Sequence, residues 1–177
     1  MPQSHPSGSI LGPAAIVETS CEFELPEQRV WAGITDAVMS LPKPVCFNLG
    51  VPLPRKCEIT SSVQGVGKTR RCTSDKGTIE QEITEFIPYK RLSFHMVAHN
   101  LRTTFAIGAM DDRFVLEPCG PGIVRLTRTT RISIPLGFAF TLRRLAIKRS
   151  LVNVHRYVYR NIRGSAPSVA SASPTSS

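Results

Sequence analysis

The 177-residue chain lacks the features that define several common protein classes. No segment reaches the ~18 consecutive apolar residues of a membrane span, and the best candidate, Ile132–Leu142, stops at Arg143. No basic start followed by an apolar run and a cleavage site is visible, so we expect no secretory signal. Hydrophobic residues make up 41% of the chain and charged residues 20%, which excludes disorder throughout. These absences predict a globular, cytoplasmic protein.

Metal-binding and nucleophilic patterns are also missing. The five cysteines contain no C-x-x-C pair, so the sequence favours reduced thiols over a disulfide or zinc framework; they are Cys21, Cys46, Cys57, Cys72 and Cys119. His95 and His99 fall on a predicted strand, where four residues span about 13 Å, too far for one metal ion. No serine or cysteine stands in a nucleophile-elbow pattern. We therefore expect no metal, no cofactor and no hydrolase triad.

Acidic residues are absent from the last third of the chain. Residues 118–177 hold ten Lys and Arg and no acid, whereas residues 1–117 hold all 13 acids. Two interpretations are open: a solvated basic helix face, or contact with an anionic partner. Tyr157 and Tyr159 are the only aromatic residues late in this region, and it has no reader motif, so no nucleic acid is expected. If the partner is anionic, weak contact with a membrane surface is the interpretation that suits a lipid carrier.

The two ends of the chain differ in composition from its middle. Residues 1–13 and 164–177 consist mostly of Pro, Ser, Gly and Ala without apolar periodicity, which predicts two disordered tails. One domain of residues 14–163 remains, large enough to bury about two-thirds of its unfolded surface.

Hydrophobic periodicity within the domain predicts an α+β fold. Ile16–Leu25 alternates as a half-buried strand, and Pro26 opens a short helix whose apolar side includes Trp31 and Val38. The proline-rich segment Leu41–Pro54 is irregular. Further strands are predicted at Lys56–Val63, Lys68–Thr73, Thr78–Phe86, Arg91–Ala98, Met110–Glu117 and Ile123–Ile134. The apolar face of Arg91–Ala98 includes Ala98.

A long helix from Pro135 to about Arg163 completes the predicted fold. One stripe of this helix is apolar and faces the sheet; it comprises Leu136, Phe140, Ile147, Leu151, Val154 and Val158. The expected architecture is a curved antiparallel sheet of about six to seven strands wrapped around this helix, with one or two short helices after the first strand.

Several motifs carry a family resemblance. They are PEQRVW at Pro26–Trp31, the glycines of Gly65–Gly67, the run Gly77–Phe94, and Phe114–Leu116 leading into Leu126–Thr130. Together they resemble the helix-grip (SRPBCC) superfamily, which includes START lipid-transfer domains, aromatic polyketide cyclases and birch-pollen-allergen-like proteins. The resemblance covers about residues 14–160. It implies a cavity for an apolar ligand between the sheet and the long helix, and it supplies no catalytic motif.

Strand register predicts a polar patch inside this sheet. A symmetric hairpin about Gly120 pairs Leu116 with Val124, Phe114 with Leu126, and Asp112 with Arg128. The hairpin at Ser74–Gly77 similarly pairs Cys72 with Ile79 and Arg70 with Gln81. Four polar residues then share the apolar face, where a charge must be paired. The patch orients a ligand, or it is a structural ion pair without a ligand role; both interpretations are open.

These patterns lead to two hypotheses for function. The first is binding, and possibly transport, of a hydrophobic small molecule or lipid, held by Cys57, Ile59, Arg70, Gln81, Phe94, Met96, Asp112, Phe114, Arg128, Leu151 and His155. The alternative is an enzyme of the polyketide cyclase or dehydratase type, with Asp112 and His155 as candidate acid–base groups. His155 flanks the apolar stripe, so it either enters the cavity or is a boundary residue satisfied by solvent.

Overall fold

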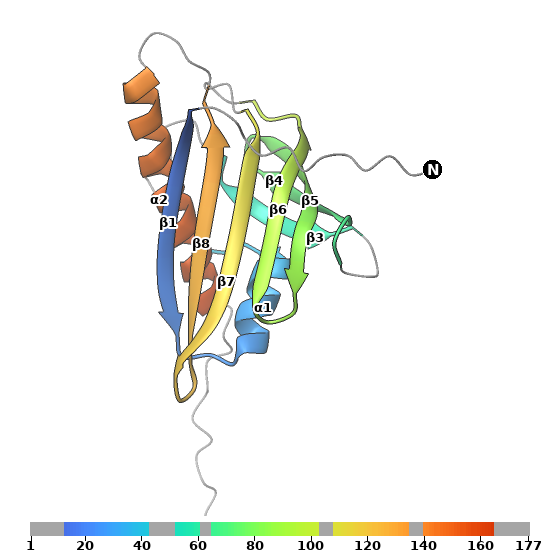
Figure 1. Ribbon diagram of the computed structural model, residues 1–177, viewed down its shortest axis with the longest axis vertical. Coiled ribbons are helices and arrows are strands. Elements are labelled where there is room, and N and C mark those ends of the chain that lie inside the picture. Colours follow the sequence, from blue (N-terminus) through green and yellow to red (C-terminus); the bar gives the residue numbers. More distant parts are fainter. Residues whose placement is uncertain (1–12, 43–51, 61–64, 103–107, 135–139, 165–177) are drawn as a thin grey trace, which may run out of the picture.

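Figure 1 shows the computed structural model, which describes residues 13–42, 52–60, 65–102, 108–134 and 140–164. Its strands are β1 (Ala14–Phe23), β2 (Ala37–Val38), β3 (Pro54–Ile59), β4 (Thr69–Ser74), β5 (Gly77–Ile87), β6 (Arg91–His99), β7 (Met110–Gly120) and β8 (Ile123–Ser133). Its helices are α1 (Glu27–Thr35) and α2 (Phe140–Gly164). Apart from Pro13 and Gly164, the predicted tails lie outside the described residues, as do Leu136 and the end of the strand predicted at Lys56–Val63.

All eight strands form one antiparallel sheet in the order β1-β8-β7-β6-β5-β4-β3-β2. The sheet curves, and α2 runs along its inner side next to β1 (Figure 1). The predicted helix-grip α+β fold is confirmed. The strand count is higher than predicted because α1 ends at Thr35 and the chain then pairs with β3 as β2. Val38, predicted on the apolar side of the helix, is instead 62% exposed on this edge strand.

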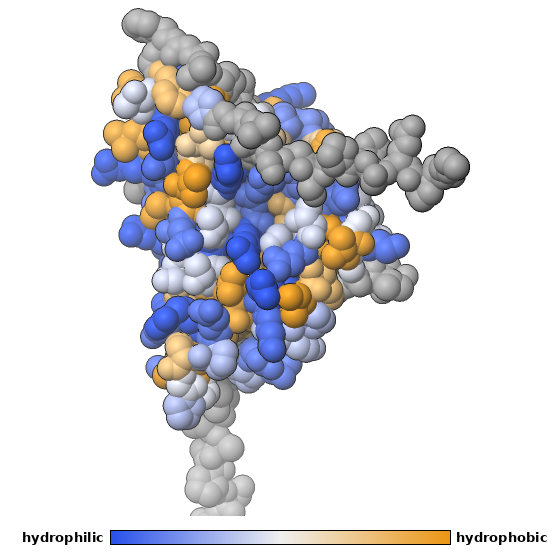
Figure 2. Space-filling view, viewed as in Figure 1, coloured by the Kyte–Doolittle hydropathy of each residue, from blue (hydrophilic) through white to orange (hydrophobic). Residues whose placement is uncertain are grey.

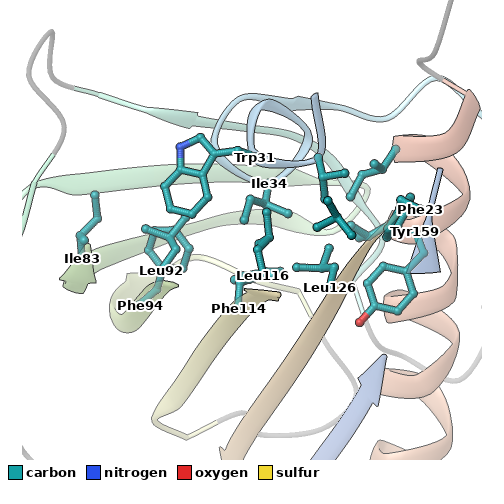
Figure 3. Close-up of a cluster of buried hydrophobic side chains, with 14 residues drawn as sticks. Phe23, Trp31, Ile34, Ile83, Leu92, Phe94, Phe114, Leu116, Leu126 and Tyr159 are labelled. Carbon is teal, nitrogen blue, oxygen red and sulfur yellow. The ribbon is translucent and has the colours of Figure 1, made fainter. Parts of the chain in front are cut away.

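The main core fills the space between the sheet and the two helices. Figure 3 shows Phe94, Phe114, Leu116 and Leu126 of the sheet in one cluster with Tyr159 of α2. Within α2 the predicted stripe is buried at Ile147, Leu151, Val154 and Val158, as expected for a helix that covers one face of a sheet. No helix of the described ranges is long and apolar enough to cross a membrane.

The register of the β7–β8 hairpin differs from the prediction by two residues. Leu116 pairs with Leu126, Phe114 with Arg128, and Asp112 with Thr130. The tight turn forms at Pro121-Gly122, where Gly122 has a φ of +70°, and an irregularity between Pro118 and Gly120 absorbs the extra residue. Because side chains alternate with a period of two, a shift of two leaves every side chain on its predicted face.

The β4–β5 hairpin has the predicted register, with Arg70 opposite Gln81 and Cys72 opposite Ile79. In the neighbouring β5–β6 pair, an irregularity between Glu80 and Gln81 displaces the end of β6. Ala98 is therefore exposed rather than on the apolar face as predicted.

Two cysteines form a disulfide, so the prediction of reduced thiols is wrong for them. Cys57 of β3 and Cys72 of β4 are directly opposite one another, with their Cα atoms 4.1 Å apart. Such a pair is joined by the sheet register, and the spacing of the cysteines along the sequence gave no sign of it. Cys21 and Cys119 are free thiols, and Cys46 lies outside the described residues.

Candidate functional site

A cavity lies between the inner face of the sheet and α2. Its volume is about 90 Å³, enough for several water molecules or an apolar group. Most of its wall is apolar, from Ile34 of α1, Ile79, Met110 and Ile132 of the sheet, and Val154 of α2. Its charged and amide side chains are Arg70, Gln81, Asp112 and Arg128.

Seven of the eleven predicted ligand-binding residues line this cavity, namely Cys57, Arg70, Gln81, Asp112, Phe114, Arg128 and Leu151. The other four are buried or packed elsewhere. Ile59 packs against the main core, and Met96 belongs to a second apolar cluster. Phe94 lies beneath the guanidinium of Arg70, and His155 is separated from the cavity by Thr130.

Asp112 and Arg128 form the predicted ion pair on the inner face. Arg128 Nε donates to Asp112 Oδ1 at 3.2 Å and Nη2 donates to Oδ2 at 2.8 Å. The hydroxyl of Thr130 donates to the same Oδ1. Burial pushes the pKa of Asp112 up, but the charge of Arg128 and these hydrogen bonds outweigh it and hold that pKa below its ordinary value. Asp112 is thus an ionised carboxylate that three donor groups already occupy.

A chain of hydrogen bonds continues behind this pair. His155 contacts Thr130 through Nε2 and Thr19 through Nδ1, both at 2.8 Å, and the Tyr159 hydroxyl lies 3.0 Å from the Thr19 hydroxyl. The direction follows from Asp112, because a carboxylate only accepts. The hydroxyl proton of Thr130 goes to Asp112, so Thr130 accepts from His155 Nε2–H, and His155 Nδ1 accepts from Thr19. Together with the burial that keeps the imidazole uncharged, this direction corresponds to the neutral Nε2–H tautomer of His155.

His155 is 0% exposed, so its interpretation as a boundary residue satisfied by solvent is wrong. Burial, with a smaller contribution from the charge of Arg128, lowers its pKa to about 3, although Asp112 opposes the shift. At neutral pH the imidazole is therefore uncharged. It connects β1 to β8 through two threonine hydroxyls.

This buried histidine makes folding stability depend on pH. The unfolded chain protonates His155 near its ordinary pKa of 6.5 and the folded chain near 3, so the unfolded state binds more protons between these values. Stability is complete above pH 6.5 and falls as pH falls towards 3, by at most about 1.4 kcal/mol per pH unit. We expect the free energy of unfolding, measured by urea unfolding at several pH values from 7 to about 4, to change less steeply with pH in His155→Gln than in the wild type. Equal slopes for the variant and the wild type would contradict this assignment.

Arg70 differs from the other charged groups of the cavity because its charge has no hydrogen-bonded partner. It is 5% exposed, and its Nε makes no hydrogen bond within the part of the chain that the structure describes. The guanidinium carbon lies 4.5 Å from the ring centre of Phe94. Burial lowers the pKa of Arg70 to about 10, with Asp112 opposing and Arg128 reinforcing the shift, so the group remains charged at neutral pH. The next residue, Arg71, points outward and pairs with Glu80.

The sequence reasoning missed three members of this polar network. Thr130 lies two residues after Arg128 on the same strand, so the period of two places it on the inner face. Thr19 lies two residues after the buried Val17, so the period of two places it on the inner face of β1. Tyr159 lies next to Val158 of the predicted stripe, and its hydroxyl donates to the Thr19 carbonyl. All three were visible as polar groups on buried faces, where a partner is required.

The charges facing the cavity do not cancel. Arg70 and Arg128 contribute two positive charges and Asp112 one negative charge, while His155 behind the wall is neutral. Asp112 is the only carboxylate among the described residues of the cavity wall, and it is fully occupied. The arrangement suits an anionic or carbonyl oxygen placed at Arg70 better than it suits proton transfer.

Comparisons with known proteins agree on the fold. No family model and no curated protein matches the chain. Among solved structures, the Zhui aromatase/cyclase from a Streptomyces species matches with a TM-score of 0.60 and 13% identity, over 86% of this chain and 93% of that one. A START superfamily protein from Mycobacterium smegmatis matches with a TM-score of 0.58 and 12% identity, over 84% of this chain and 94% of that one. A major latex-like protein from Panax ginseng matches with a TM-score of 0.58 and 11% identity, over 86% of this chain and 97% of that one. At these identities the similarity concerns the fold alone.

Proposed function

We propose that this chain, which has the helix-grip fold of START and birch-pollen-allergen-like proteins, binds a hydrophobic small molecule or lipid between its sheet and α2. The observation that carries the proposal is Arg70, a buried and charged guanidinium that forms no hydrogen bond with a described residue, in an otherwise mostly apolar cavity. Stranding such a group costs several kcal/mol. A ligand with an anionic or carbonyl oxygen would satisfy Arg70 and place its apolar part against Val154 and Ile132.

The same site gives less support to the alternative, a polyketide cyclase or dehydratase. Arg70 could polarise a carbonyl in such an enzyme, but the reaction also needs a group that takes up or releases a proton. Asp112 is ion-paired with a lowered pKa, and His155 is shielded behind Thr130. Binding and carriage of the ligand therefore fit the site better than an enzymatic reaction on the ligand.

The Cys57–Cys72 disulfide bears on the cellular location. Because disulfides occur mainly in oxidising compartments, the expected cytoplasmic location is not part of this proposal.

Two fluorescent probes with one aromatic skeleton test ligand binding in the cavity. Anilinonaphthalene sulfonate carries an anion and N-phenylnaphthylamine does not, and both should bind the wild type with enhanced emission. Val154→Phe fills the cavity from α2 and should weaken both probes about tenfold or more, equivalent to about 1.4 kcal/mol. The matched control Val152→Phe, on the same helix but away from the cavity wall, should bind both probes like the wild type.

Equal binding by Val154→Phe and wild type would place the probes elsewhere and overturn the proposal. Native mass spectrometry of the purified protein gives a second measurement, because a co-purifying apolar acid would appear as a discrete mass increment. Turnover of a poly-β-keto thioester mimic would instead support the enzyme.

A further inference from the structure

The solvent side of α2 carries an unusual set of charges. Six basic residues of the helix are at least partly exposed, and they are Arg143, Arg144, Lys148, Arg149, Arg156 and Arg160. The last three of these, Arg149, Arg156 and Arg160, point directly away from the buried stripe. The helix contains no acidic residue, and none of the six forms an ion pair with a described residue. Arg144 and Lys148, like Arg156 and Arg160, are four residues apart, a spacing at which like charges repel. A surface helix that only needed solubility would mix both signs.

Two leucines extend the same face at the start of the helix. Leu142 is 68% exposed and Leu145 is 54% exposed. At 100° per residue they fall within about 60° of Arg149, Arg156 and Arg160, on the side opposite the buried stripe. At the upper left of Figure 2, where α2 begins, hydrophobic and hydrophilic residues adjoin on the surface. The face thus combines exposed apolar tips with unpaired positive charge.

We propose that this face of α2, defined by Arg149, Arg156, Arg160 and the two leucines, docks on an anionic lipid bilayer. Anionic headgroups would supply the charge that the helix lacks, and each basic residue near such a surface adds to the attraction. Leu142 and Leu145 would enter the boundary between headgroups and acyl chains, as the apolar residues of interfacial helices do. This inference is independent of the ligand-binding proposal, because it concerns the opposite side of α2.

The leucines favour a bilayer over a nucleic acid as the occupant. Phosphate contacts of a nucleic acid would use the arginines alone and would leave both leucines in water. An acidic protein would require a complementary apolar pocket as well. A bilayer takes up both features on one surface.

Binding of the full chain to vesicles tests the proposal. Affinity for vesicles of phosphatidylserine and phosphatidylcholine should exceed that for phosphatidylcholine alone, and should fall steeply between about 0.05 and 0.3 M salt. The triple variant Arg149→Glu/Arg156→Glu/Arg160→Glu should lose about a hundredfold or more in affinity. A matched control reverses three exposed basic residues of other elements, Arg55, Lys68 and Lys90, with the same change in net charge, and should lose less than about threefold.

The leucine contact has its own readout. In Leu142→Trp the new indole should shift its emission to the blue on anionic vesicles and should be quenched by brominated acyl chains. Val97→Trp places an indole at a 50% exposed position of the sheet and should do neither. Trp31 is buried and supplies a constant background in both variants.

Three results would overturn the proposal. The first is equal affinity of the two triple variants for anionic vesicles, which would mean that net charge alone, and not the face of α2, determines binding. The second is a solvent-like emission of Leu142→Trp on the vesicles. The third is binding to duplex RNA that the α2 reversal abolishes, while Leu142→Ser/Leu145→Ser leaves it unchanged and vesicles do not bind.

Discussion

Replacing Asp112 with alanine is expected to lower the free energy of unfolding by about 3–5 kcal/mol. Asp112 is 4% exposed and accepts hydrogen bonds from Nε and Nη2 of Arg128 and from the hydroxyl of Thr130. Removing it leaves the guanidinium of Arg128 buried without a carboxylate, beside the second cation, Arg70. The hydroxyl of Thr130 also loses its acceptor. Urea unfolding followed by circular dichroism measures the change.

The double variant Asp112→Ala/Arg128→Met should recover part of this loss, because it strands no charge and the methionine keeps the stem that packs near Phe114. The matched control is Asp111→Ala. This neighbouring carboxylate points to the other face of β7, where it is partly exposed and contacts His95, so its removal should cost less than about 1 kcal/mol. A double variant less stable than Asp112→Ala would contradict the stranded-charge argument.

The ion pair also illustrates how far the sequence predicts the structure. Alternation placed Asp112 and Arg128 on the inner face, and burial of Phe114 and Leu126 fixes which face is inside. The pairing partner was wrong, since a symmetric turn was assumed where an irregularity precedes Gly120. The two side chains still meet because the long side chain of Arg128 reaches its diagonal neighbour Asp112 across the strands. Face is thus set by a local pattern, whereas register depends on turn geometry that the residues alone do not determine.

His155 and the disulfide show a second limit. Helical periodicity put His155 at the edge of the buried stripe, where its exposure depends on the facing strand. The hydroxyls of Thr19 and Thr130 lie opposite it, so the imidazole is satisfied inside the protein. Cys57 and Cys72 likewise meet only because β3 and β4 pair in that register. Such contacts between distant segments carry no periodic signal of their own.

The polar network gives the cavity a stiff charged wall. Asp112, Thr130, His155 and Thr19 link β7, β8, α2 and β1 by hydrogen bonds that run in one direction. Every donor in this network of hydrogen bonds is used, and this also fixes the position of Arg128. Arg70, which also lines the cavity, has no such partner among the residues that the structure describes. The network therefore has a structural role that does not require a ligand, whereas the guanidinium of Arg70 is the group that we propose a ligand satisfies.

Replacing Arg70 with methionine should separate binding from stability. The methionine keeps the aliphatic stem and a favourable contact with the Phe94 ring, and it removes the unpaired buried charge. We expect the free energy of unfolding to rise by about 1 kcal/mol or more. Affinity for anilinonaphthalene sulfonate should fall about 10- to 100-fold, the value of one charge-assisted hydrogen bond. N-phenylnaphthylamine, which lacks the anion, should bind about as before.

The ratio of the two probe affinities isolates the contribution of the charge, because a general loss of cavity shape would weaken both probes alike. Arg71→Met is the matched control, since Arg71 is the next residue of β4 but points outward to Glu80. This variant should bind both probes with the affinity of the wild type. A lower stability of Arg70→Met with unchanged affinity for the sulfonate would mean that Arg70 serves the fold alone. In that case the cavity would select its ligand by shape, and the anionic or carbonyl oxygen of the proposed ligand would have to be given up.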